Sequence, residues 1–209
     1  MNKIEQIKLA IKNGVNKHSK LTEEPLNGVG GFTSPNIRHI MNNLGAISTS
    51  YLDVGAHIGC SLIMTRFGND NLNYAISIDN WSEFQNDGRT KDEFISNCER
   101  HIPGKYTFIE KNCFKVTNDE IPDPIDLFLY DAGHDFESQK EGVTHFVPMM
   151  AEEFVLMVDD TAWKAPREGT YAGIKEAGLE ILWETFLFDG IEGGSFWNGF
   201  SIFLLKKQS

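Results

Sequence analysis

The sequence has few cysteines, no dense cluster of basic residues and no long apolar run. Its three cysteines, Cys60, Cys98 and Cys113, lack C-x-x-C spacing, which argues against a disulfide framework and a zinc site. Free thiols in a reducing compartment fit this pattern best. No apolar run reaches the roughly 20 residues of a transmembrane helix, and the opening MNKIEQIKLAIKNG lacks the apolar core of a signal peptide. We therefore expect a cytoplasmic protein with no membrane partner.

The charge balance is acidic. Asp and Glu number 30 against 19 Lys and Arg, which gives a formal net charge of -11. Proteins that bind nucleic acid usually carry a basic face, so a nucleic-acid partner is disfavoured. Hydrophobic residues make up 41% of the 209 residues and include 15 Phe. This content supplies the core of one folded domain and argues against disorder.

The N-terminal part predicts two helices joined by a glycine-rich loop. Ile4, Ile7 and Ile11 recur at helical spacing, and the pattern stops at Gly14. The segment GVGGFTSP, residues 28–35, reads as a flexible loop, and NIRHIMNNL predicts a second helix that ends at Gly45. We expect residues 1–45 to form a helical cap or lid on residues 46–209, which form one structural unit.

From residue 50 onward, strand-like and helix-like segments alternate. Strands are predicted at 49–55, 73–80, 105–112, 125–133 and 153–160, and most are separated by segments with helical periodicity. This alternation predicts an α/β fold, a Rossmann-like three-layer sandwich with a parallel sheet. The last two strand segments, 179–188 and 195–207, are separated only by DGIEGG. So short a link allows a hairpin and not a crossover helix, so this pair is expected to be antiparallel.

Acidic residues follow several of the predicted strands. In an open parallel sheet, ligands bind at the carboxyl ends of the strands. One acid there is readily explained as a helix cap, but acids at four strand ends favour a ligand site. These acids are Asp53, Asp79, Asp131 and the pair Asp159 and Asp160.

The turn after the first strand reads D-V-G-A-H-I-G. Gly55 and Gly59 would let the backbone approach a ligand closely. Their G-x-x-x-G spacing differs from the G-x-G-x-x-G that cradles a pyrophosphate. A carboxylate at Asp53 would repel a dinucleotide phosphate and attract a cationic ligand. The alternative is a plain strand–turn–helix in which Asp53 acts as a cap.

The second strand ends in Asp79, Asn80 and Trp81. An acid at this position is placed to accept hydrogen bonds from two ribose hydroxyls. It would serve NAD and S-adenosylmethionine equally, so it indicates a nucleoside without identifying it. Trp81 is interpreted either as a platform for the base or as a core residue.

Together these motifs carry a family resemblance. The D-V-G-x-x-x-G turn, Asp79, the Asn112-Cys113-Phe114 segment and the closing hairpin resemble class I S-adenosylmethionine-dependent methyltransferases. The segment DLFLYDAGHDFES, with the later strand ending in DD, is similar to the macrocin O-methyltransferase-like group and, more distantly, to catechol-type O-methyltransferases. The resemblance runs from about residue 28 to the C-terminus. It implies strand order 3-2-1-4-5-7-6 with strand 7 antiparallel, S-adenosylmethionine as cofactor, and a sugar or phenolic small molecule as methyl acceptor.

The resemblance also implies site residues. Asp53, Gly55 and Gly59 would surround the methionine end of the cofactor, Asp79 the ribose, and Cys113 or Phe114 the adenine. The full set of implied cofactor-binding residues is Asp53, Gly55, Ala56, Gly59, Asp79, Asn80, Trp81, Asn112, Cys113, Phe114 and Asp131.

Related enzymes hold magnesium through acids at the ends of strands four and five, which here are Asp131, Asp159 and Asp160. Neighbouring strands lie about 4.8 Å apart, so these carboxylates would converge and repel unless a proton or a cation joins them. Oxygen ligands suit Mg²⁺, Mn²⁺ or Ca²⁺. The alternative is that one of the tandem Asp residues faces solvent or caps the next helix.

His134 and Asp131 are the candidate catalytic residues. A metal-bound acceptor hydroxyl would have a lowered pKa, and a neutral imidazole at His134 suits proton removal at pH 7. His134 would alternatively orient a loop or hydrogen-bond Asp159. Three other functions compete: a metal-independent methyltransferase, an NAD-dependent oxidoreductase and a non-catalytic binding protein. The aromatic C-terminal hairpin is either core or the face of a homo-oligomer.

Overall fold

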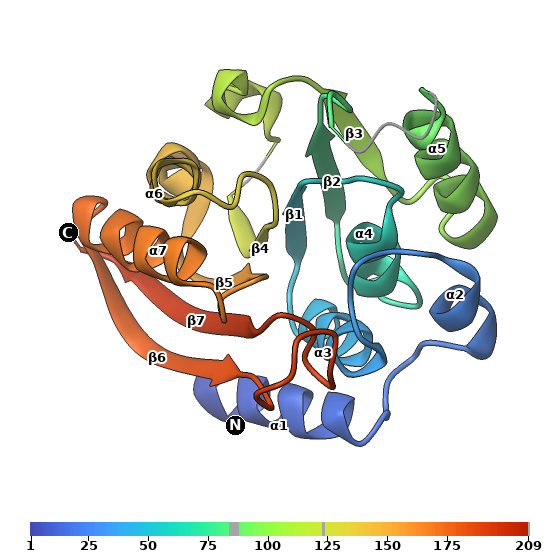
Figure 1. The fold of residues 1–209 in the computed structure, drawn as a ribbon, viewed down its shortest axis with the longest axis horizontal. Coiled ribbons are helices and arrows are strands. Elements are labelled where there is room, and N and C mark those ends of the chain that lie inside the picture. The colour runs from blue at the N-terminus through green and yellow to red at the C-terminus, as the bar shows by residue number, and fades with distance from the viewer. Residues whose placement is uncertain (84–87, 123, 209) are drawn as a thin grey trace.

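A computed structural model describes residues 1–83, 88–122 and 124–208 (Figure 1). In these residues the sheet has seven strands in the order β3-β2-β1-β4-β5-β7-β6. β1 to β5 pair in parallel, and β7 is antiparallel to both β5 and β6. The predicted strand order and the antiparallel seventh strand are confirmed. The strands are β1 Ser50–Val54, β2 Tyr74–Asp79, β3 Thr107–Glu110, β4 Ile125–Tyr130, β5 Met150–Val158, β6 Leu179–Leu187 and β7 Phe200–Lys207.

Helices cover both faces of the sheet and complete the three predicted layers (Figure 1). Buried residues of α1, α3, α4 and α5 share one core with the sheet, and those of α6 and α7 share a second core on the other face. The α-helices are α1 Lys3–Val15, α2 Glu23–Gly28, α3 Pro35–Gly45, α4 Cys60–Arg66, α5 Thr90–His101, α6 Phe136–Phe146 and α7 Lys164–Glu176. The short 3-10 turns are η1 Cys113–Lys115, η2 Asn118–Glu120 and η3 Val147–Met149.

The N-terminal helices pack tightly against the sheet. Ile7 of α1 and Ile40 of α3 are fully buried, in the same core as Tyr51 of β1. A Cβ atom at Gly14 would lie 2.7 Å from the backbone nitrogen of Ile40, so α1 approaches α3 as closely as two backbones allow. Ser34 caps α3 by accepting a hydrogen bond from the Ile37 amide, and Pro35 begins the helix. The end of the α2–α3 loop where α3 begins is therefore fixed by this cap.

Two helices, α2 and α7, were not predicted from the sequence. α7 contains Pro166, Gly169 and Gly173, which are poor helix formers. The two glycines face α6 instead of solvent. A Cβ at Gly169 would lie 2.5 Å from the Phe136 carbonyl oxygen, and one at Gly173 would lie 2.7 Å from Val143 Cβ. The close approach of α6 and α7 thus explains why α7 contains Gly169 and Gly173, although glycine lowers the helical propensity of the segment.

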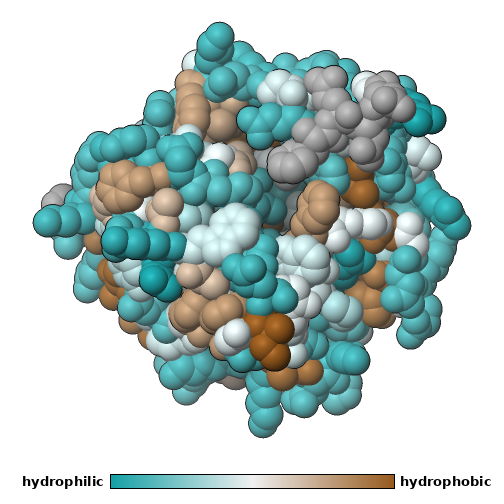
Figure 2. Space-filling model, in the orientation of Figure 1, coloured by the Kyte–Doolittle hydropathy of each residue, from teal (hydrophilic) through white to brown (hydrophobic). Residues whose placement is uncertain are grey.

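No helix in the described part of the chain is both long and apolar enough to cross a bilayer. The molecular face in Figure 2 is mainly hydrophilic, and its apolar residues form separate small groups instead of one broad patch.

Candidate functional site

A cavity of about 570 Å³ opens at the carboxyl ends of the parallel strands. This is where open α/β sheets bind ligands. Its walls come from segments far apart in the sequence. They are the loop at 31–33, the turn at 54–57, the end of β2 and residues after it, residues 111–114 after β3, residues 129–134, Asp159 and Asp160 after β5, and residues 197, 198 and 200 at the start of β7.

The turn after β1 requires glycine at its first position. Gly55 has φ +102°, and a Cβ there would lie 1.9 Å from the backbone oxygen of Asp131. Its amide donates to the Ile78 carbonyl at 3.0 Å, so the ends of β1, β2 and β4 meet at this residue. Gly55 and Ala56 both line the cavity. Gly59, at φ +89°, precedes α4 and lies outside the cavity lining.

Asp53 lies behind the cavity wall. It is fully buried and accepts hydrogen bonds from Ser61 Oγ at 2.7 Å, Tyr51 Oη at 3.2 Å and Ser77 Oγ. Burial raises the pKa of the Asp53 carboxyl to about 7. Ser61 does line the cavity. Asp53 thus faces the cavity only through Ser61, a residue that the sequence reasoning missed although it stands two positions after Gly59.

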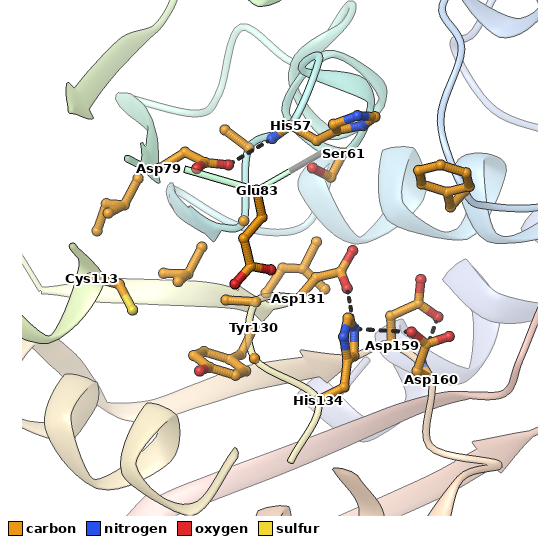
Figure 3. Close-up of a pocket in the computed structure, with 18 of the residues that line it drawn as sticks. His57, Ser61, Asp79, Glu83, Cys113, Tyr130, Asp131, His134, Asp159 and Asp160 are labelled. Atoms are coloured by element: carbon orange, nitrogen blue, oxygen red, sulfur yellow. Dashed lines mark hydrogen bonds and ion pairs between the residues drawn. The ribbon is translucent and has the colours of Figure 1, made fainter. Parts of the chain in front are cut away.

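Asp79 presents a carboxylate to the cavity with both oxygens already fixed. Oδ2 accepts from the His57 amide at 2.9 Å (Figure 3), and Oδ1 accepts from the Trp81 amide at 2.7 Å. A carboxylate has about four acceptor sites, so Asp79 retains capacity for two further donors. Asn80 lines the cavity beside it.

Trp81 is outside the cavity lining. Its indole packs against Phe94 and Phe108, with ring centroids 5.3 and 5.7 Å apart, and Nε1 donates to the His57 carbonyl at 2.8 Å. Of the two interpretations of Trp81, the geometry favours the core residue.

Residues after β3 form an apolar part of the cavity. Asn112 Oδ1 accepts from the Phe114 amide at 3.0 Å and starts the η1 turn. Asn112, Cys113 and Phe114 all line the cavity. Burial raises the pKa of the Cys113 thiol to about 11, so the thiol is neutral at pH 7.

Three ionisable residues converge elsewhere in the cavity. His134 Nε2 lies 2.9 Å from Asp160 Oδ2 and 3.4 Å from Asp131 Oδ1 (Figure 3). Contact with Asp131, and then with Asp160, raises the pKa of His134 to about 10. These contacts favour the protonated imidazole when no metal ion is bound, whereas the predicted role of His134 as a base requires the neutral form.

The same three residues fit a divalent cation. Their ligand atoms lie within 4.8 Å of one another. Among the described residues, His134 Nε2 and Asp160 Oδ1 are buried and make no well-aligned hydrogen bond. Such atoms are expected where a cation binds. The two carboxylates suit Mg²⁺, Ca²⁺ or Mn²⁺, whereas an imidazole ligand is more typical of transition metals.

Asp159 is not part of this group, although the sequence predicted it as a ligand. It lines the cavity, is 6% exposed, and accepts from the Asp160 amide at 2.9 Å. Burial, with Asp131 and Asp160 nearby, raises the pKa of Asp159 well above its usual range. The structure thus brings together Asp131, His134 and Asp160.

Loops complete the wall around this group. The amides of Thr161 and Ala162 donate to the carbonyls of Gly199 and Asn198, at 3.1 and 2.9 Å. Ser34 Oγ donates to the Ser195 carbonyl at 2.6 Å, which joins the N-terminal and C-terminal loops. Residues of these loops that line the cavity are Gly31, Phe32, Thr33, Trp163, Trp197 and Asn198. Of the 28–35 loop, residues 31–33 thus form part of the cavity wall.

Comparison with known proteins agrees with this fold, which is that of a class I methyltransferase. A family model described as a methyltransferase domain matches residues 52–161, more than half of the chain. The chain belongs to this family of methyltransferases. No curated protein sequence matches the chain.

Solved structures share the fold at low sequence identity. An O-methyltransferase from Bacillus cereus, in complex with SAH, is 14% identical, with TM-score 0.63 over 99% of this chain and 93% of that one. Cofactor-bound Rv0187 from MTB is 15% identical, with TM-score 0.63 over 98% and 91%. TomG from Streptomyces achromogenes, an O-methyltransferase involved in tomaymycin synthesis and solved with SAM, is 12% identical, with TM-score 0.63 over 94% and 89%.

Proposed function

We propose that this methyltransferase transfers the methyl group of S-adenosylmethionine to a hydroxyl of a small molecule. The observation that carries the proposal is one cavity that joins the glycine turn and Asp79 to the Asp131–His134–Asp160 group. The relatives solved with SAM or SAH support the choice of cofactor.

The cofactor half of the cavity is formed by the ends of β1, β2 and β3. Asp79 would accept hydrogen bonds from the ribose hydroxyls. The backbone at Gly55 and Ala56 would contact the methionine part, and Ser61, held by Asp53, would bind its polar end. The segment Asn112 to Phe114 would contact the adenine. Asn80, Gly59 and Trp81 would support these groups from beside or behind the cavity wall.

The acceptor half contains the acids and the imidazole. The acceptor oxygen forms a bond to the methyl carbon while the carbon–sulfur bond breaks, and the electron pair stays on sulfur as SAH. The hydroxyl proton passes to a carboxylate of Asp131 or Asp160. In the form without a cation, protonated His134 would lie between these acids, orient them and offset their repulsion. Most of the rate enhancement would come from positioning and electrostatics.

A divalent cation, Mn²⁺ or Mg²⁺, would be held by Asp131, His134 and Asp160, and when bound it would stabilise the deprotonated hydroxyl. Asp159 would orient Asp160 through its hydrogen bond to the Asp160 amide. The metal-independent alternative is favoured by the ion pairs that His134 makes with both acids. The N-terminal segment 1–45 would cap the acceptor half through residues 31–33.

The test is SAH formation from S-adenosylmethionine with hydroxylated acceptors, before and after treatment with a chelator. We expect turnover that chelation lowers by at least about tenfold and that Mn²⁺ or Mg²⁺ restores. Turnover that chelation leaves unchanged would establish the metal-independent form. Absence of SAH formation with every acceptor, in protein that binds S-adenosylmethionine, would contradict the proposed acceptor class.

A further inference from the structure

The ionisable residues that line the cavity are mostly acids. Five acids line the cavity with three basic residues, Lys111, His57 and His134, and both Lys111 and His134 are paired with acids. Lys111 Nζ lies 2.8 Å from Glu120 Oε2, and His134 lies between Asp131 and Asp160. Within the described part of the chain, the lysine and the histidine nearest the acid group are thus already engaged by acids, which disfavours a carboxylate or phosphate on an acceptor. The acids are Asp79, Glu83, Asp131, Asp159 and Asp160.

A further carboxylate lies at the mouth of the acceptor half. Glu192 is an exposed residue in the loop between β6 and β7, and its Oε1 accepts a hydrogen bond from Trp163 Nε1 at 2.9 Å. Trp163 lines the cavity and is 40% exposed, so its ring reaches from the cavity to solvent. The Trp163 amide also donates to the Asp160 carbonyl at 3.0 Å. The ring and the carboxylate are therefore held in a defined relation to Asp160.

Trp163 connects the two polar ends of the acceptor half. One edge of its ring contacts His134, with centroids 5.9 Å apart, and its nitrogen contacts Glu192. An acceptor that lies along this ring would place one end at the Asp131–His134–Asp160 group and the other at Glu192. Indole faces bind both the flat faces of rings and cations, by packing and by cation–π attraction. Phe32, Trp197 and Phe200 add further aromatic surface to the lining.

We infer that the methyl acceptor is a hydroxyl-bearing ring that also carries a protonated amine, an inference that rests on the proposed function. The hydroxyl binds at the Asp131–His134–Asp160 group, where Asp160 Oδ1 is buried without a hydrogen-bond partner among the described residues. The ammonium binds Glu192 beside the Trp163 ring. Glu192 is then the residue that determines specificity for the cation. Two chemical sources share this pattern: arylalkylamines with ring hydroxyls, and amino sugars.

The experiment compares acceptors that differ only in the charge of one substituent. The aromatic series is 3,4-dihydroxybenzylamine, 3,4-dihydroxybenzyl alcohol and 3,4-dihydroxybenzoate, and the sugar series is glucosamine, glucose and glucuronate. Values of kcat/KM for SAH formation are measured for wild type, Glu192→Gln and the control Glu152→Gln. The Glu192→Gln variant retains an acceptor oxygen for Trp163 Nε1 and removes the negative charge of Glu192. Glu152 is exposed in β5 and outside the cavity lining, so its substitution removes an equal charge elsewhere.

We expect the cationic acceptor of one series to exceed the neutral one by about tenfold, and the anionic one to be the poorest. Glu192→Gln should lower this cation-to-neutral ratio by about tenfold, an effect that weakens at high salt. Glu152→Gln should leave the ratio unchanged. The series that turns over distinguishes an aromatic amine from an amino sugar.

Three outcomes would overturn the inference. The first is a preference for the anionic acceptor in wild type, and the second is a cation-to-neutral ratio that Glu192→Gln does not change. The third is no turnover of either series by protein that binds S-adenosylmethionine in calorimetry, which would refute this acceptor class and leave the cofactor assignment intact. Protein that does not bind S-adenosylmethionine would instead contradict the proposed function itself.

Discussion

The two halves of the cavity are built in different ways. The cofactor half is formed by turns that directly follow β1, β2 and β3, and its key groups are fixed by backbone contacts such as those of Asp79 and Gly55. The acceptor half is enclosed by loops from both ends of the chain, joined by contacts such as Ser34 to Ser195. The geometry of the cofactor half depends on the sheet. The acceptor half depends on loops, whose sequence can change without disturbing the sheet. On the proposed function, the cofactor and the acceptor would therefore be recognised by separable parts.

The largest effect should come from the joint between β1 and β4. Gly55→Ala would place a Cβ against the Asp131 backbone and require an unfavourable φ. We expect a loss of at least about 3 kcal/mol in stability together with loss of cofactor binding. Denaturant unfolding and calorimetry measure the two. Gly28→Ala is the matched control, since a Cβ there meets nothing within 4 Å. Normal cofactor binding by Gly55→Ala would refute the tight-joint explanation.

The next effect concerns stability and pH. Because burial raises the folded-state pKa of Asp53 from 3.8 to about 7, folding favours its protonated form. Its contribution is fully present below pH 3.8 and is lost as the pH rises through about 7. The free energy of unfolding of wild type, compared with Asp53→Asn, should fall by about 4 kcal/mol between pH 4 and pH 8. A difference that stays constant over this range would show that Asp53 remains charged in the folded protein.

A third substitution separates the two halves directly. Asp160→Asn keeps the size of the side chain but removes a charge from the acceptor group. We expect kcat to fall about 100-fold while the affinity for S-adenosylmethionine changes less than about twofold. Steady-state kinetics and calorimetry on the same preparation provide both values, with Glu152→Gln as the charge control. An equal loss in both would mean that the halves are not separable.

The reciprocal substitution is Asp79→Asn. Loss of hydrogen bonds to a charged acceptor should weaken S-adenosylmethionine binding by about 10- to 30-fold. The KM for the acceptor, at saturating cofactor, should remain within about twofold. A larger change in acceptor KM than in cofactor affinity would show that Asp79 acts in the acceptor half and not in the cofactor half.

The smallest effect is expected at the N-terminal loop. Phe32 is 62% exposed and stacks on His57, with centroids 5.5 Å apart. Phe32→Ala should raise the acceptor KM by about threefold, because only a partly exposed contact is removed. Phe32→Leu should recover most of the loss. No change in acceptor KM with either variant would remove this loop from the acceptor half.

The cofactor half was largely predictable from the sequence, for a physical reason. Parallel strands place their carboxyl ends at one edge, so residues such as Gly55 and Asp79 are brought together by the fold alone. The seven-strand order followed from the family resemblance and the short link before β7. The sequence predicted Asp53 at the end of the first strand. It did not predict that Asp53 lies behind the cavity wall, because this position depends on partners such as Ser77 in the next strand.

The acceptor half was less predictable. The ionisable group contains His134 instead of Asp159, whose carboxylate accepts a hydrogen bond from the Asp160 amide. Asp160 itself has φ +56°, a left-handed conformation that the local sequence does not predict. The contacts of Trp163 with Glu192 and of Ser34 with Ser195 join residues far apart in the chain, which periodicity and spacing do not encode.

The most direct test of the central claim is calorimetric titration of the wild-type protein with S-adenosylmethionine and, separately, with NAD. We predict one S-adenosylmethionine site per chain and no heat of binding for NAD. The dissociation constant for S-adenosylmethionine should be in the micromolar range, which corresponds to a binding free energy of about -8 kcal/mol. Binding of NAD, without binding of S-adenosylmethionine, would contradict the account.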